Sequence, residues 1–264
     1  MSNLRRFAVF GGVYNNYLSL KATLEDARAQ GAEEIYCLGD MGGFGPHPDR
    51  VFPLLREQQD LFVMQGNYDH SIGNRLDDCA CGYTDPRDNH FAQISYDYTL
   101  ANTSEEHKDW LKALPTEFRR QWGGSRVLMS HGSPRAVNEF LWESMCSDVF
   151  LEHLLRGVEA DVLFVTHTGI PWQRVLPGGA RVVNVGAIGR PANDGRTSVD
   201  YVMVEVEGDR LEVEFRSVDY DHHRLAREMD EEGLPKEFSE TILTGWWTTC
   251  LEILPAKERA KGRY

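Results

Sequence analysis

Four residues with metal-binding side chains each follow a short apolar run in the sequence. They are Asp40, Asn67, His131 and His167. A fifth apolar run ends at the loop Gly12-Val13-Tyr14. Carboxylates, amide oxygens and imidazoles are side-chain groups that divalent metal ions accept as ligands. A single His or Asp after a strand is usually an ordinary loop residue, but four at successive strand ends predict a shared polar site.

The apolar runs alternate with helical patterns in units of about 30 residues over the N-terminal part of the chain. The predicted strands are 6–11, 34–38 and 61–64, and the predicted helices between them are 18–30 and 48–58. Such alternation is typical of a parallel sheet with covering helices. Because functional groups collect at the carboxyl ends of parallel strands, we expect the chemistry in the loops at 11–16, 39–47 and 66–70.

The rest of the chain continues the α/β pattern. After a long polar loop at 71–90, we expect helices at 89–100 and 104–113, and strands at 126–129, 162–165, 173–176, 181–184, 199–206 and 210–217. The last two strands form a hairpin that turns at Gly208-Asp209. A helical C-terminal extension is expected at about 220–264. The sequence has no linker or internal repeat, so residues 1–264 are predicted to form a single domain.

The chain is acidic, with 41 Asp and Glu against 28 Lys and Arg and a formal net charge of −13. Such a surface repels phosphates, so we expect no nucleic acid partner. No stretch approaches the roughly 20 apolar residues that a membrane helix needs, so no membrane partner is expected. The five cysteines are odd in number and mostly scattered, which is typical of a reducing compartment rather than of a disulfide framework. We predict a cytoplasmic protein, whose oligomeric state the sequence does not fix.

Five short motifs follow the predicted strands. They are Gly39-Asp40 with Gly43-Phe-Gly-Pro46, Gly66-Asn67-Tyr68-Asp69, His131-Gly-Ser-Pro134, Thr166-His-Thr-Gly169 and Asn184-Val-Gly-Ala-Ile-Gly-Arg-Pro191. Together they resemble the calcineurin-like metallophosphoesterases, in the branch of small bacterial and archaeal phosphodiesterases. The resemblance implies a four-layer αββα sandwich, in which two mixed β-sheets are flanked by helices. It also implies hydrolysis of a phosphomonoester or phosphodiester, with Asp40, Asn67, His131 and His167 as metal ligands.

The chain departs from the family pattern at three positions. The family's first Asp falls on Gly12, its paired His on Tyr14, and the second His of its G-H-T-H motif on Gly169. In the family these positions bind the first of two metal ions, and Asp40 bridges to the second. A glycine offers no side-chain ligand, and a phenol with a pKa of about 10 is a poor ligand for a divalent ion. The resemblance therefore implies one divalent transition metal ion, Mn, Fe, Zn or Ni, in the second site.

Three residues after the third predicted strand are candidates for catalysis. In many family members the position of Tyr68 is a His that helps to protonate the leaving group, and Tyr occurs there as well. Asp69 is expected to orient neighbouring groups. His70 is a candidate general acid if it faces the cleft, and the alternative is a solvated loop histidine.

Candidates for substrate binding lie in other loops. Tyr14 offers a ring for stacking and a hydroxyl, and Asn15 belongs to the same reshaped loop. Arg190 follows a glycine-rich turn at 186–189, whose backbone N–H groups could bind a phosphate together with the guanidinium. The alternative is a tight turn between strands. His47 either contacts the phosphate or caps the next helix.

The segment Cys79-Ala-Cys81 lies in the long polar loop. Two thiols this close can bind a metal, but no second cysteine pair accompanies them, so a structural metal site is not expected. Related phosphoesterases often carry a similar C-x-C-G-Y segment, which suggests a loop folded over the cleft.

Two functions are compatible with this pattern. The first is a metal-dependent phosphoric ester hydrolase with an incomplete dinuclear site, acting on a small phosphorylated ligand. The alternative is a catalytically impaired homologue that binds a phosphorylated ligand or a protein partner, and a purely structural subunit is a weaker third interpretation. All three missing ligands belong to the first metal site, and all four ligands of the second site are present. Random decay would damage both, so the pattern favours a retained ion or ligand, and retained binding more firmly than turnover.

Overall fold

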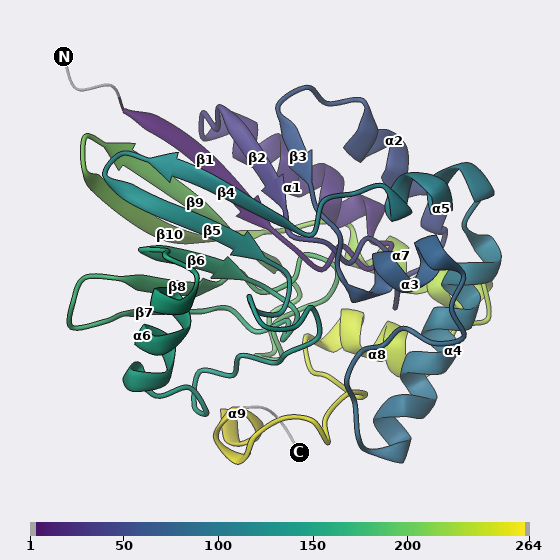
Figure 1. Cartoon of the computed structure of the whole chain (residues 1–264). Coiled ribbons are helices and arrows are strands. Elements are labelled where there is room, and N and C mark those ends of the chain that lie inside the picture. The colour runs from purple at the N-terminus through teal and green to yellow at the C-terminus, as the bar shows by residue number, and fades with distance from the viewer. Residues whose placement is uncertain (1–3, 262–264) are drawn as a thin grey trace.

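The computed structural model describes residues 4–261 and contains two five-stranded sheets that face each other (Figure 1). The first sheet has the strand order β10-β9-β1-β2-β3. Its strands are β1 (Arg5–Phe10), β2 (Glu34–Cys37), β3 (Leu61–Val63), β9 (Val199–Glu207) and β10 (Arg210–Val218). The first three strands run parallel, and β9 is antiparallel to β1 and forms a hairpin with β10. This sheet is therefore mixed.

The second sheet has the strand order β4-β5-β6-β8-β7. Its strands are β4 (Glu117–Trp122), β5 (Ser125–Ser130), β6 (Val162–Val165), β7 (Trp172–Val175) and β8 (Arg181–Asn184). The three inner strands are parallel, and the two edge strands are antiparallel to their neighbours. The carboxyl ends of β5 and β6 thus lie side by side, which places the loops after them at one edge.

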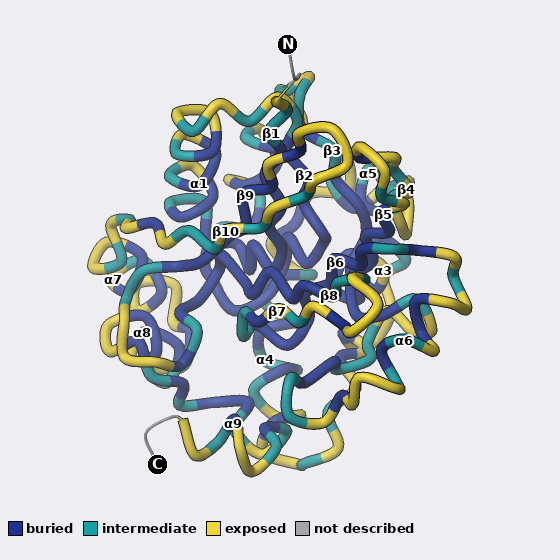
Figure 2. Tube along the Cα trace, turned by 90° about the vertical axis from the view of Figure 1, so that its left-hand side faces the viewer, coloured by how far each residue is buried: buried dark blue, intermediate teal, exposed yellow. Residues whose placement is uncertain are grey.

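The central strands of both sheets are buried on both faces, as the dark centre of Figure 2 shows, whereas the edge strands β4, β7 and β10 are partly exposed. Between the sheets, Phe7 of β1 stacks on Trp122 of β4 with ring centroids 4.2 Å apart. Helices α1 (Tyr17–Ala29) and α2 (Val51–Arg56) pack on the outer face of the first sheet. Helix α6 (Asp148–Gly157) packs its buried leucines on the outer face of the second. The predicted four-layer αββα sandwich is confirmed.

The remaining helices surround the carboxyl ends of the strands (Figure 1). They are the short 3₁₀ helix η1 (Pro48–Arg50), α3 (Asn67–Asn74), α4 (Pro86–Asn102), α5 (Glu105–Lys112), α7 (His222–Glu231), α8 (Lys236–Thr244) and α9 (Ala256–Lys261). Within residues 4–261, no helix has the length and apolar character needed to cross a membrane.

Two elements differ from the sequence-based prediction. Strand β4 was not expected, because its sequence Glu-Phe-Arg-Arg-Gln-Trp is mostly polar; it is an edge strand, where exposed charged side chains are tolerated. Helix α3 begins at Asn67 and extends into the segment predicted as a long loop. The backbone of the Gly66-Asn67-Tyr68-Asp69 motif is therefore helical from Asn67 on, and this decides which way its side chains point.

Candidate metal centre and its cavity

The loops after β2, β5 and β6 bring three metal-binding side chains together. Asp40, His131 and His167 are buried, and one ligand atom from each lies within 4.8 Å of the others. His131 Nε2 is 3.2 Å from Asp40 Oδ2 and 3.2 Å from His167 Nδ1. Asp40 and His167 have positive φ angles of 58° and 64°, so the backbone turns sharply after each strand. These turns direct the three side chains to one point at the edge of the sheets.

The ring of His131 is fixed by a backbone group. Its Nδ1 lies 2.7 Å from the carbonyl oxygen of Leu38, which can only accept a hydrogen bond. Nδ1 therefore carries a proton, and Nε2, which lies 3.2 Å from Asp40 Oδ2, is the nitrogen that an ion would bind in place of any second proton. A histidine whose second nitrogen donates to a carbonyl is oriented and made more basic for metal binding.

Asn67, the first residue of α3, is the candidate for a fourth, oxygen ligand. Its side-chain amide nitrogen donates to the carbonyl oxygen of Cys79 at 2.9 Å and lies 3.4 Å from Cys81 Sγ. The Oδ1 atom is left buried and has no hydrogen-bond partner in the described part of the chain. A buried acceptor without a donor is costly unless another partner satisfies it. A divalent ion would satisfy it, so these four side chains fit one transition metal ion.

The charges within this cluster set its protonation. Burial raises the pKa of Asp40, but the imidazoles of His131 and His167 outweigh burial and hold that pKa below its usual value. Burial lowers the pKa of His131, and the Asp40 carboxylate outweighs it and raises the pKa. Burial and the neighbouring His131 lower the pKa of His167 to about 3. An ionised carboxylate and a neutral imidazole are the forms in which these groups bind metal.

Asp69 ties the loops of the centre together. Its carboxylate accepts hydrogen bonds from the backbone N–H groups of Asp40 at 2.6 Å, Met41 at 2.9 Å and Gly66 at 2.8 Å. Burial and the nearby Asp40 carboxylate raise the pKa of Asp69 to about 7. Since both of its oxygens are engaged by the backbone, Asp69 positions the metal ligands, in keeping with the orienting role expected for it.

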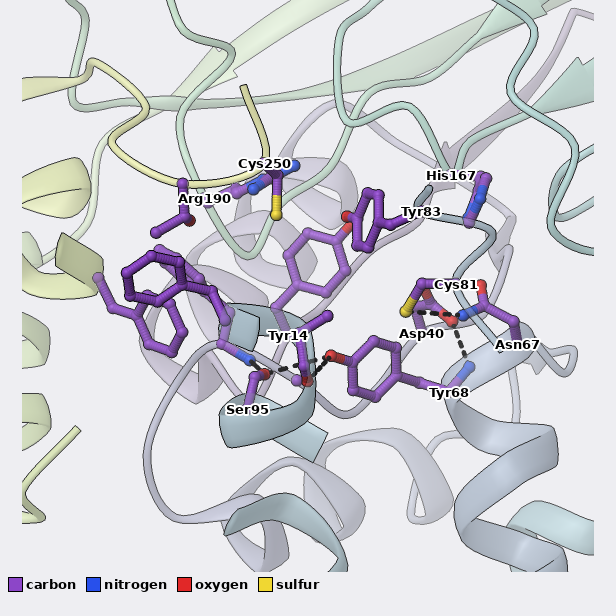
Figure 3. Close-up of a pocket in the computed structure, with 16 residues that line it drawn as sticks. Tyr14, Asp40, Asn67, Tyr68, Cys81, Tyr83, Ser95, His167, Arg190 and Cys250 are labelled. Atoms are coloured by element: carbon purple, nitrogen blue, oxygen red, sulfur yellow. Dashed lines mark hydrogen bonds between the residues drawn. The ribbon is translucent and has the colours of Figure 1, made fainter. Parts of the chain in front are cut away.

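A narrow cavity opens beside the centre, with about 50 Å³ of free volume. Asp40, Asn67 and His167 lie at one end and Arg190 at the other, with Tyr14 between them (Figure 3). Aromatic rings form much of the remaining wall, from Phe44, Tyr68, Tyr83, Phe91 and Phe238. A space of this size holds a few water molecules or one small polar group.

The three positions that depart from the family pattern lie against this cavity or its wall. A Cβ atom on Gly12, whose φ is +56°, would be 2.7 Å from Ala187 Cβ and 2.9 Å from Tyr14 Cζ. A Cβ atom on Gly169, whose φ is +72°, would be 3.5 Å from Arg190 Nη2. Burial raises the pKa of the Tyr14 phenol above its usual value, so it stays protonated. A tyrosine ring and a guanidinium thus fill the space in front of the two glycines.

Tyr68 and Asn15 have different surroundings. Tyr68 lines the cavity, its hydroxyl lies 3.3 Å from Ser95 Oγ, and burial raises its pKa well above the usual value. Asn15 is fully buried, and its amide nitrogen donates to the Gly45 carbonyl oxygen at 3.0 Å and to Thr99 Oγ1 at 3.1 Å. Asn15 therefore braces the loop that carries Tyr14, whereas a substrate contact was expected.

His47 and His70 lie away from the cavity, so neither is placed to contact a ligand there. His47 occupies the N-cap position of η1 without a side-chain hydrogen bond to that helix, and for His70 the alternative of a solvated histidine holds. His47 is 3.7 Å from a carboxylate oxygen of Glu228 and 3.7 Å from one of Glu232, near α7. His70 is exposed on α3, and its Nδ1 is 3.3 Å from Gln65 Oε1. The helix turns the His70 side chain outward, because it is one residue past the inward-facing Asp69. In this structure His70 is a solvated histidine.

Residues that sequence analysis did not single out complete the wall. Tyr83 reaches the cavity from the segment that contains Cys79 and Cys81, and Cys250 reaches it from the chain after α8. The signal for Tyr83 was the C-x-C-G-Y pattern, whereas no local pattern marks Cys250. Cys79 and Cys81 form a disulfide, although the cysteine count predicted free thiols. The disulfide-bonded loop packs on Asn67 through the hydrogen bond to the Cys79 carbonyl oxygen.

Comparison with known proteins identifies relatives over most of the chain. A model of the calcineurin-like phosphoesterase superfamily domain matches residues 6–209. An uncharacterized protein of Methanocaldococcus jannaschii is 25% identical in an alignment 254 residues long, which covers 90% of this chain and 97% of that protein. The crystal structure of a metallophosphoesterase from Sphaerobacter thermophilus aligns with a TM-score of 0.70 at 25% identity, over 92% of this chain and 100% of that chain. A hypothetical protein from Pyrococcus horikoshii OT3 aligns with a TM-score of 0.74 at 24% identity, over 92% and 99%.

Proposed function

Because the chain belongs to the calcineurin-like phosphoesterase superfamily, we propose that it is a phosphoesterase that uses one divalent transition metal ion. The observation that carries the proposal is the buried cluster of Asp40, His131 and His167, with ligand atoms within 4.8 Å of one another. The unpartnered Oδ1 atom of Asn67 supplies a fourth ligand. Mn, Fe, Zn and Ni all accept such a set.

A single ion is proposed because residues 4–261 offer one group of His, Cys, Asp or Glu side chains that could hold an ion, and no second. Hydrolysis with two ions needs them about 3.5–4 Å apart, with ligands for each. Gly12 and Gly169 have no side chains, and burial raises the pKa of Tyr14, so its phenol is a poor ligand at neutral pH. The residues present therefore do not fit an ion in the family's first site.

When bound, an ion in the cluster supplies Lewis-acid chemistry toward a phosphoryl group. The chain prepares its ligands for this, since the Leu38 carbonyl orients His131 and the Asp69 carboxylate fixes the turn that carries Asp40. Tyr68 lies on the cavity wall, and its raised pKa keeps the hydroxyl protonated. This hydroxyl lies 3.4 Å from the Ala92 carbonyl oxygen and 3.3 Å from Ser95 Oγ, and its proton would turn from these acceptors to donate to an oxygen of the substrate.

The cavity supports a small phosphorylated ligand, as either a phosphomonoester or a phosphodiester. The cavity is narrow, with a free volume of about 50 Å³. The net charge of −13 would repel the phosphates of a nucleic acid. Tyr14 and the other aromatic rings of the wall enclose this space, which suits one small polar group such as a phosphoryl group, so an organic part of the ligand would lie outside it. A cytoplasmic location is likewise a proposal: the free cysteines Cys37, Cys146 and Cys250 are compatible with a reducing compartment, whereas the Cys79–Cys81 disulfide does not support it.

The alternative function is a homologue that binds a phosphorylated ligand or a protein partner without turnover. One observation favours it: among residues 4–261, the only histidine that lines the cavity is the metal-cluster residue His167. No separate imidazole is therefore placed to protonate a leaving group. The enzyme and the binding protein share the metal cluster, so turnover distinguishes them.

Elemental analysis of protein purified without chelator or nickel resin, paired with hydrolysis of bis(p-nitrophenyl) phosphate in Mn²⁺, tests the proposal. We expect one ion per chain, and we expect Asp40→Ala and His131→Ala to lose both the ion and turnover. His153→Ala, at an exposed histidine of α6, is a matched control and should keep both. Two ions per chain would contradict the single site, and an ion without turnover would assign the protein to the binding class. Protein that takes up no ion would refute the metal centre.

A further inference from the structure

Arg190 is a buried cation at the end of the cavity opposite the metal centre (Figure 3). Only 6% of its surface is exposed. Its guanidinium carbon lies 3.6 Å from the centroid of the Trp247 ring and 5.7 Å from that of Tyr14. The polar groups that act on it most strongly are Cys250, which also forms a side-chain hydrogen bond with it, Tyr14 and Tyr83, and none of these three is a carboxylate. Its Nε atom is buried and has no hydrogen-bond partner within residues 4–261.

Within residues 4–261 this guanidinium has no salt bridge to a carboxylate, and the groups that act on it most strongly are a thiol and two phenols. Arginine remains protonated in proteins, so the charge cannot be avoided by losing a proton. Burying a charge without a partner is costly, because the hydrogen bonds to water are lost. Contact with the Trp247 ring offsets part of this cost, and that ring is fixed by its own hydrogen bond to the Pro191 carbonyl oxygen at 2.7 Å. An anion in the cavity would satisfy both the charge and the free N–H group.

The guanidinium also lies where the chain lacks metal ligands. Its Nη2 atom is 3.5 Å from the point where a Cβ atom on Gly169 would be, two residues after the metal-cluster residue His167. The Tyr14 hydroxyl is 3.0 Å from the corresponding point on Gly12. A fixed positive charge and a hydroxyl donor thus occupy the region that would face a second ion.

We propose that Arg190 binds the phosphoryl group of the ligand and takes the place of the first metal ion. In this arrangement the ligand lies between one metal ion at the cluster and one guanidinium at the opposite end of the cavity. A planar guanidinium presents paired N–H donors that match two oxygens of a phosphate. The inference rests on the proposed function for its ligand class, but binding to Arg190 itself requires no metal ion.

The backbone fixes Arg190 in this position. In the preceding turn, the N–H of Ile188 donates to the Gly11 carbonyl oxygen at 3.0 Å, and the N–H of Gly189 donates to the Gly12 carbonyl oxygen at 2.7 Å. The turn is thereby attached to the loop that carries Tyr14. Since these N–H groups are already engaged, the phosphate-binding turn considered from the sequence is not formed by them. The Arg190 side chain remains as the group that can bind the anion.

Titration calorimetry of metal-free protein with inorganic phosphate tests the proposal. We expect saturable binding to the wild-type chain, and a loss of about 10- to 100-fold in affinity for Arg190→Met, which corresponds to one charged hydrogen-bonding group. Arg56→Met is the matched control, because Arg56 is an exposed arginine that also lies over a tryptophan ring, 5.9 Å from the centroid of Trp110. This variant should bind phosphate as the wild type does.

A second titration, with Mn²⁺ alone, separates this inference from the proposed function. Arg190→Met should bind Mn²⁺ as the wild type does, because Arg190 is not a metal ligand. If metal-free wild-type protein does not bind phosphate, or if Arg190→Met binds it equally well, the inference is wrong even when one ion binds the cluster. If Arg190→Met does not fold by circular dichroism, the same comparison is made with Arg190→Lys, which keeps the charge without the paired donors and should also bind phosphate more weakly.

Discussion

Restoring the family's first aspartate, by Gly12→Asp, should destabilise this protein without creating a second metal site. Two features of Gly12 oppose any side chain. Its φ is +56°, in the left-handed region, and a Cβ atom there would lie 2.7 Å from Ala187 Cβ and 2.9 Å from Tyr14 Cζ. Carbon atoms do not approach this closely without displacing one another, so the loop or the Tyr14 ring has to move.

The expected cost has two parts. The left-handed backbone costs a residue with a Cβ atom about 1–2 kcal/mol. Inserting an atom into a packed region costs a further 1–3 kcal/mol or so. The free energy of unfolding should therefore fall by roughly 2–5 kcal/mol, a large part of the 5–15 kcal/mol that is typical of a folded domain. The protein should stay folded, with a displaced Tyr14 and one metal ion per chain.

Urea unfolding of Gly12→Ala, Gly12→Asp and Gly208→Ala measures these parts separately. Gly208 has a similar φ of +61°, but nothing lies within 4 Å of a Cβ atom placed there, so Gly208→Ala reports the backbone cost alone. The loss of stability in Gly12→Ala beyond that in Gly208→Ala is the packing cost. Part of this cost should disappear when Tyr14→Ala is also present, because the phenol ring is then gone. The reasoning fails if Gly12→Ala costs no more than Gly208→Ala, or if Gly12→Asp binds a second ion at full stability.

Two further predictions concern residues near the centre. Asp69→Ala should lower the free energy of unfolding by roughly 3 kcal/mol or more and weaken Mn²⁺ binding, because the N–H groups of Asp40, Met41 and Gly66 lose their acceptor. Urea unfolding and calorimetry measure the two effects. Unchanged stability and Mn²⁺ affinity would contradict the positioning role of Asp69. His70→Ala should keep kcat and KM for bis(p-nitrophenyl) phosphate within about twofold of wild type, as expected for an exposed side chain outside the cavity. A large loss of kcat alone would show that His70 reaches the substrate.

The sequence predicts most of the sheets because buried parallel strands have continuous apolar runs, as in Phe164 and its neighbours in β6. Strand β4 lacks a continuous apolar run, because it lies at the sheet edge, where its arginines remain partly or largely exposed. The ligand positions were also predictable, because Asp40 and His131 come directly after strands whose carboxyl ends meet. For these residues, a position just after a predicted strand was enough to mark them as candidate ligands.

Side-chain direction and long-range contacts were not predictable in the same way. Asp69 and His70 are adjacent, yet helix α3 turns one inward and the other to solvent, and a single step along a helix rotates the side chain by about 100°. Predicting His70 therefore required knowing that α3 starts at Asn67. Trp247 reaches Arg190 across more than 50 residues of sequence, a contact that no local periodicity can indicate. These non-local contacts define the cation end of the cavity.

The lost metal ligands are best understood as one coupled change in packing. Tyr14 needs Gly12, because a side chain at position 12 would overlap the phenol ring. Arg190 lies beside Gly169, and a longer side chain there would extend toward the guanidinium and the Trp247 ring, whose atoms are 3.4–3.5 Å from the Cβ position. If the positions had decayed independently, the space they left would be empty or filled by apolar atoms. Here it holds a buried cation and a hydroxyl, which are groups that bind an anion. The replacement therefore argues that the cavity retains a charged ligand, and that the retained metal cluster and Arg190 act on it together.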